Sequence, residues 1–148
     1  MTGQMMRHFR NLVSKIKKNC EKQARTESHL KYLYKCKEKS IIPRGLNLLR
    51  LVKSETIWES NESTFEILME SSKKLLDQEI AKWEKKKTNL ENQKNSFMKR
   101  LEENSTIETF RTENEALERH KLNVFNEENK TKVGKILRDT EDLIHMLD

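Results

Sequence analysis

The sequence predicts an all-α protein built from long helices, and three observations support this prediction. Charged residues make up 36% of the 148 positions and hydrophobic residues only 34%, which is too polar for an ordinary globular core. Three Gly and one Pro supply few turns. Apolar residues recur at alternating steps of four and three, the period of coiled coils. We therefore expect elongated helices that bury one stripe each against a partner helix, in the same chain or in another.

The first element is a basic N-terminal helix over residues 1–40. Its seam, meaning the positions that repeat every 3.5 residues, is Met5, Phe9, Leu12, Ile16, Asn19, Gln23, Thr26, Leu30 and Leu33. The ends of this seam are apolar and its centre is polar, which costs stability at three successive positions. Two interpretations remain open at this point: one helix with a weak centre, or two shorter helices with a flexible join near Arg25–Ser28.

An apolar linker interrupted by Pro and Gly follows over residues 41–59. Pro43 is expected to end the first helix at about Ile42, and Gly45 permits a turn. The patch at 41–52 is the densest apolar stretch of the chain: Ile41, Ile42, Leu46, Leu48, Leu49, Leu51 and Val52. Loops are normally polar, so we expect this patch to pack onto a helix pair or to dock a protein partner.

The third element is a long helical coiled-coil region over residues 60–148, which can begin near Ser60 or Ser63. Its seam is expected to mediate oligomerisation, and its apolar members include Leu76, Ile80, Trp83, Leu90, Phe97 and Leu101. Lysines at two further seam positions, Lys87 and Lys94, disfavour a tight parallel homodimer and favour a loose or antiparallel pairing.

A break near Asn104 is the main uncertainty within this region. Ser105 and Glu108 have the spacing of a capping box, which favours a new helix from Thr106. Nothing at 103–105 forces a turn, because Gly and Pro are both absent. We therefore expect a continuous or merely kinked helix, with the break as the alternative.

The charges are distributed unevenly along the chain. Residues 1–53 carry 14 Lys or Arg against 3 acids, whereas residues 54–148 carry 16 bases and 21 acids. A basic arm joined to a weakly acidic body is typical of proteins that touch polyanions while self-associating.

The candidate nucleic-acid-binding residues follow from this arm: Lys31, Tyr32, Tyr34, Lys35, Lys37, Lys39 and Arg44. The basic side chains would neutralise phosphates, and the tyrosines could stack on unpaired bases. No base-reading motif is present, so such binding should tolerate any sequence and weaken steeply with salt. In the alternative interpretation Leu30, Leu33 and Tyr34 form a packing stripe, and the lysines only keep the helix soluble.

No catalytic or cofactor motif points to an enzyme. The four histidines are scattered, and Cys20, His29 and Cys36 match no common zinc spacing. Three glycines cannot build a phosphate loop, so no cofactor and no metal are expected. Two cysteines with no secretory signal indicate a reducing compartment, the cytoplasm or the nucleus. No apolar run is long enough to predict a transmembrane segment. The acid-free start is also compatible with mitochondrial targeting, or with an interfacial membrane helix at Met5–Lys18.

The segment at 29–48, HLKYLYKCKEKSIIPRGLNL, resembles coiled-coil open reading frames associated with vertebrate retroelements. The matching residues are His29, Leu30, Tyr32, Leu33, Cys36, Ile42, Pro43, Arg44, Gly45 and Leu46. The resemblance covers about 20 residues and implies a helical, self-associating accessory protein of a mobile element, with no assigned activity.

These observations predict a non-enzymatic structural or assembly protein. We expect it to form a homo-oligomer or to bind a helical protein partner, and to bind nucleic acid non-specifically through residues 7–53. The alternative is an adaptor that docks a protein partner through the apolar patch at 41–52.

Overall fold

The computed structural model describes residues 3–41, 43 and 64–147, and within these ranges the chain is helical with no strand. The helices are α1 (Gly3–Glu38), α4 (Thr64–Glu103) and α5 (Ile107–Leu147). The predicted all-α class is confirmed. None of these helices, over the residues described, is long and apolar enough to cross a membrane.

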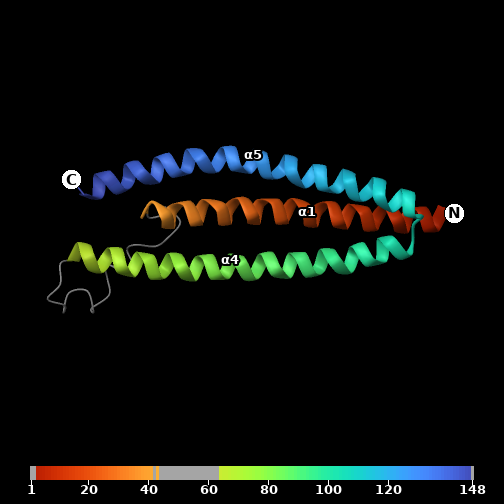
Figure 1. Cartoon of the computed structure of the whole chain (residues 1–148), viewed down its shortest axis with the longest axis horizontal. Coiled ribbons are helices and arrows are strands. Elements are labelled where there is room, and N and C mark those ends of the chain that lie inside the picture. Colours follow the sequence, from red (N-terminus) through yellow and green to blue (C-terminus); the bar gives the residue numbers. More distant parts are fainter. Residues whose placement is uncertain (1–2, 42, 44–63, 148) are drawn as a thin grey trace.

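Helix α1 lies between α4 and α5, as Figure 1 shows, with α4 antiparallel to it and α5 parallel to it. Both later helices pack along α1, whereas they touch one another in few places. The N-terminal helix is therefore the element on which the other two pack, and not an arm separate from the helical body. Coiled-coil geometry and self-association stay predictions.

The predicted seam of α1 is buried from Leu12 onward, although Met5 at its start is 57% exposed. The helix continues without interruption across Arg25–Ser28, which decides between the two interpretations in favour of one helix. The polar centre of the seam is buried as well, because Asn19, Gln23 and Thr26 all lie inside.

Hydrogen bonds explain how the polar centre tolerates burial. The Asn19 side-chain amide donates to the Leu90 carbonyl at 3.1 Å and to Gln93 Oε1 at 3.0 Å. Gln23 Nε2 donates to Asn19 Oδ1 at 2.6 Å, and Lys121 Nζ donates to Gln23 Oε1 at 3.2 Å. Burial of an amide costs little when it has hydrogen-bond partners, and these bonds join α1 to both of its neighbours.

A second buried stripe on α1 was not predicted. It follows steps of four residues through Cys20, Ala24, Ser28, Tyr32 and Cys36. Steps of four advance about 40° each around a helix, so this stripe winds away from the seam. Cys20 packs in a cluster with Leu117, and the Tyr32 hydroxyl donates to Asp139, so the stripe contacts α5 at both of these positions.

The predicted seam of α4 is turned inward. Leu76, Ile80, Leu90 and Leu101 are buried, and Trp83 and Phe97 are half-buried. The apolar residues gather in two clusters. One contains Leu30, Leu33, Leu76 and Ile80, and the other contains Leu12, Ile16, Leu101 and Leu117. The apolar face of α4 is thus covered by α1 of the same chain.

Helix α1 ends earlier than Pro43 predicts, at a left-handed residue. Ser40 has φ 54°, its N–H donates to the Lys37 carbonyl at 3.3 Å, and the Ile41 N–H donates to the Cys36 carbonyl at 2.8 Å. These two bonds form a Schellman cap, and Ile41 packs in the same cluster as Cys36. The other members of the predicted apolar patch, Ile42 and the residues from Leu46 to Val52, lie outside the described residues.

The chain reverses direction at residues 104–106, so the expectation of a continuous helix through this point is wrong. The Asn104 side chain donates to the Arg100 carbonyl at 2.7 Å, and Ser105 Oγ donates to the Leu101 carbonyl at 2.6 Å. These bonds close the last turn of α4 without glycine. The cap of α5 is Thr106, not Ser105, because the Thr109 N–H donates to Thr106 Oγ1 at 3.2 Å.

Candidate nucleic-acid interface

Positive charge is concentrated on the central helix. Helix α1 has ten Lys or Arg against three acids, α4 has nine against eight, and α5 has seven against nine. All ten basic residues of α1 are exposed although the helix is central. Such a surplus on one element attracts polyanions, and the two flanking helices are close to neutral.

The predicted lysines lie on the surface of α1 and just beyond it. Lys31 Nζ lies 5.7 Å from the centre of the Phe125 ring, and Lys37 forms an ion pair with Asp77 at 2.9 Å. Lys35 lies 3.8 Å from Glu38, and Lys39 is exposed after the helix end. Exposed pairs of this kind hold their charges weakly, so these lysines can still meet a phosphate.

The two predicted tyrosines differ in burial and in the side chains to which their hydroxyls donate. Tyr32 is only 4% exposed, and burial, followed by its hydrogen bond to Asp139, raises the pKa of its hydroxyl. Its ring therefore cannot stack on a base in this fold. Tyr34 is exposed, and its hydroxyl donates to Glu84 Oε1 at 2.7 Å. The predicted set is therefore not brought together as one surface, and Arg44 lies outside the described residues.

A second set of residues, which the sequence reasoning missed, forms a continuous line on α1. It follows alternating steps of four and three and contains no acid: Gln4, His8, Asn11, Lys15, Lys18, Lys22, Arg25 and His29. All of these are exposed except the half-buried His29. We call this line the cationic stripe. Its period was visible in the sequence, but the search for that period considered seams of apolar residues.

One end of the cationic stripe runs into an open groove of about 590 Å³, which we call the three-helix groove. All three helices line it: Lys22, Arg25, Thr26 and His29 of α1, Trp83, Lys86 and Leu90 of α4, and Glu128 and Lys132 of α5. The groove exists because α4 and α5 lie on α1 rather than on each other. Four permanent cations and one acid face it.

The aromatic side chains of the groove support its cations. The His29 and Trp83 rings lie 4.3 Å apart between centroids, and Lys86 Nζ lies 4.5 Å from the centre of the Trp83 ring. Burial, then Lys132 and Lys135, lowers the pKa of His29 to about 4. The imidazole is therefore neutral at pH 7, and its Nδ1 can accept from Lys132 Nζ at 3.2 Å.

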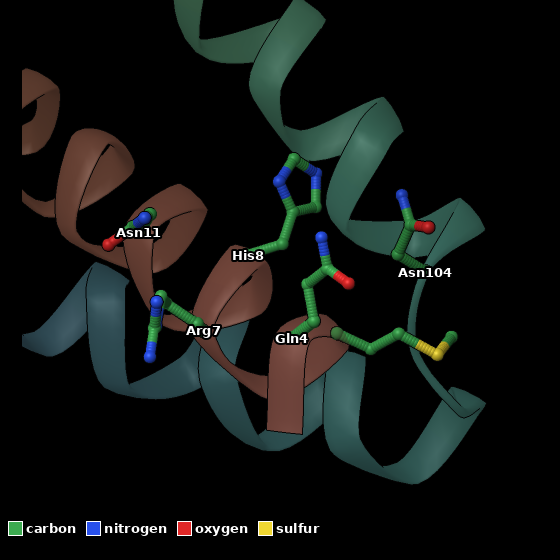
Figure 2. A pocket seen from close by; sticks show the side chains of 6 residues that line it. Gln4, Arg7, His8, Asn11 and Asn104 are labelled. Atoms are coloured by element: carbon green, nitrogen blue, oxygen red, sulfur yellow. The ribbon is translucent and has the colours of Figure 1, made fainter. Parts of the chain in front are cut away.

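The other end of the stripe borders a hollow of about 450 Å³ near the turn between α4 and α5. Figure 2 shows Gln4 and His8 of α1 and Asn104 of the turn around this space. Arg7, Asn11 and Met5 complete its lining. Amide, imidazole and guanidinium groups of this kind donate hydrogen bonds to phosphate, sugar and base oxygens alike.

The residues described do not gather three His, Cys, Asp or Glu side chains in an arrangement that could hold a metal ion. Cys20 and Cys36 are free thiols inside the fold. Burial raises the pKa of the Cys36 thiol to about 11 and also raises that of Cys20, so neither is an activated nucleophile.

Comparison with known proteins adds no assignment, because no family model, curated protein or solved structure matches the chain.

Proposed function

We propose that this protein is a non-enzymatic structural or assembly protein that binds nucleic acid without sequence specificity through α1. The observation that carries the proposal is the exposed positive surplus of this one helix, ten bases against three acids, between two nearly neutral helices. Contacts to phosphates release counterions and give affinity that does not depend on sequence.

The resemblance at residues 29–48 agrees with this proposal in a limited way. Four of its residues, Leu30, Tyr32, Leu33 and Cys36, are buried packing residues of α1. They therefore support a common helical framework rather than a common ligand. A role as an accessory protein of a mobile element stays a proposal.

Fluorescence anisotropy with a labelled oligonucleotide tests the nucleic-acid proposal. Replacing Lys31, Lys35, Lys37 and Lys39 together with Gln should lower the affinity and flatten its salt dependence. Each phosphate contact that is lost removes about 0.7 from the slope of log K against log salt for a single strand. A matched control replaces four exposed lysines of α4 with Gln: Lys73, Lys74, Lys82 and Lys85. Wild-type affinity that does not change with salt contradicts the proposal.

Self-association is a second proposed property, and the exposed side of α5 favours it. Leu122, Val133, Leu137 and Ile144 are each more than half exposed, and Leu137 reaches 63%. At 100° per residue these four positions fall within an arc of about 60°, so they form one apolar stripe. Because the seam of α4 is covered by α1, this stripe of α5 is the surface we propose for a second copy of the chain.

Light scattering of the Leu137→Lys variant tests this surface. We expect the wild type to associate in the tens of micromolar range, and the variant to remain monomeric with unchanged helicity. The control is Thr131→Lys, because Thr131 is exposed on the opposite side of α5. A wild type that is monomeric at these concentrations contradicts self-association.

A further inference from the structure

We infer that a single strand of nucleic acid lies along the cationic stripe, with one of its phosphates held in the three-helix groove by Lys22, Lys86 and Lys132. This inference rests on the proposed function and names its site and its ligand. The stripe differs from the lysines at 31–39, so the two can be tested separately.

The charges in the groove are the first argument. Glu128 is the one acid among the residues that line the groove, and it forms an ion pair with Arg25 at 3.5 Å. No second carboxylate of the lining is left to balance the three lysines. Among the described residues, no carboxylate lies within ion-pair distance of Lys22, Lys86 or Lys132. Each of these ammonium groups comes from a different helix, so the fold itself assembles a positive centre that an anion can occupy.

The environment of Lys132 is the second argument. Its ammonium is half-buried, and its nearest acceptor is the neutral Nδ1 of His29 at 3.2 Å. It also lies 5.6 Å from the centre of the Tyr32 ring. The acid that acts on this ammonium is Glu128, which is already paired with Arg25, while Lys135 adds a second positive charge nearby. Partly buried positive charge of this kind is costly, and an anion in the groove would lower that cost.

The length of the cationic stripe favours a chain of phosphates over a compact anion. From Asn11 at one hollow to His29 in the groove the helix advances about 27 Å, at 1.5 Å per residue. Lys15, Lys18, Lys22 and Arg25 lie between these ends, on the same side. A single small anion would use the groove alone, whereas a strand can contact the whole line.

The shape of the groove favours a single strand over a duplex. Residues of all three helices line the groove, so a ligand has to reach between α4 and α5 to contact Lys22, Lys86 and Lys132 together. A flexible single strand can place one phosphate there, whereas a rigid duplex would rest across the two outer helices. An acidic peptide would match the charge, but the amide groups of Gln4, Asn11 and Asn104 at the far hollow suit unpaired bases and sugars better.

The experiment uses Trp83 as a reporter of the groove. The Trp58→Phe variant leaves Trp83 as the single tryptophan, since the chain has two. Phosphate binding should draw Lys86 away from the indole ring and change the Trp83 emission. The probes are an oligothymidine strand, a duplex of equal length, a polyglutamate peptide and inorganic phosphate. We expect the strand to bind most tightly and inorganic phosphate at least a hundredfold more weakly.

The test variant replaces Lys22, Lys86 and Lys132 with Gln. We expect at least a tenfold loss of affinity for the strand at low salt, and a salt slope smaller by about 0.7, because the three lysines hold one phosphate. The matched control replaces Lys17, Lys85 and Lys130, one exposed lysine on each helix, outside the lining of the groove. Far-UV circular dichroism checks that both variants fold. Lys86→Gln alone provides a milder version, because Lys86 is exposed, and it should lower the affinity less than the triple variant does.

The outcomes separate this inference from the proposed function. If the wild type binds no strand, both fail. If the groove variant and its control lose affinity equally, the groove is wrong while non-specific binding through α1 stands. Tighter binding of the duplex or of polyglutamate would overturn the single-strand assignment.

Discussion

The hydrogen-bonded centre of α1 gives the sharpest stability prediction. Asn19 is 3% exposed and makes bonds to Leu90, Gln93 and Gln23. In the Asn19→Leu variant the buried Gln23 amide loses its acceptor. Leaving a buried donor without a partner costs about 1–3 kcal/mol, and the added apolar contact of leucine offsets part of that cost. We expect a net loss of about 1–2 kcal/mol in the free energy of unfolding.

The double variant Asn19→Leu/Gln23→Leu should recover most of this loss. Replacing both partners by apolar side chains of similar size leaves no unpaired amide. Lys121 still has Glu27 as a partner at 2.9 Å after Gln23 is removed. The coupling between the two substitutions should therefore amount to about 1–2 kcal/mol.

Urea unfolding followed by far-UV circular dichroism measures these differences. The m-value should be the same for all variants, so that only stability changes. Asn123→Leu serves as a control because Asn123 is exposed on α5, and its effect should stay within about 0.5 kcal/mol. A double variant that loses as much as the sum of the two single variants would refute the idea that these amides act as one network.

Three other predictions concern single residues. Ser40→Gly should stabilise the protein by about 1 kcal/mol in urea unfolding, because glycine adopts the φ of 54° without strain. The low pKa of His29, about 4 against an ordinary 6.5, means that the unfolded chain takes up this proton first as pH falls. The wild type should thus lose more stability than His29→Gln between about pH 6.5 and pH 4, and an equal loss would contradict the burial argument. Cys36, with a pKa of about 11, should react with iodoacetamide at pH 8 only as fast as the protein unfolds; rapid native labelling would disprove this.

The heptad pattern predicted buried faces well because apolar spacing is a direct consequence of helix geometry. Leu12, Ile16, Leu30 and Leu33 of α1 and Leu76 of α4 all lie inside, as their period indicated. The pattern does not say which helix covers which seam. A chain that folds back on itself and a pair of associated chains present the same period, so the pairing of α1 with α4 could not be derived from it.

The features that sequence reasoning missed depend on polar side chains in unusual roles. Asn104 and Ser105 close the end of α4 through their side chains, where a search for turns looks for Gly or Pro. Ser40 occupies a left-handed position that glycine normally fills. The second stripe of α1 contains Ala24 and Ser28, which are fully buried but too small or too polar to stand out by hydropathy.

The central position of α1 also bears on how the protein is made. The ribosome releases this helix before the other two, yet both surfaces that cover it come from residues 64–147. At 5–20 residues per second, about 5–20 s separate the synthesis of the first helix from that of its last partner. Packing of the three helices therefore has to wait until α5 has been made, and it should proceed as one cooperative event rather than helix by helix.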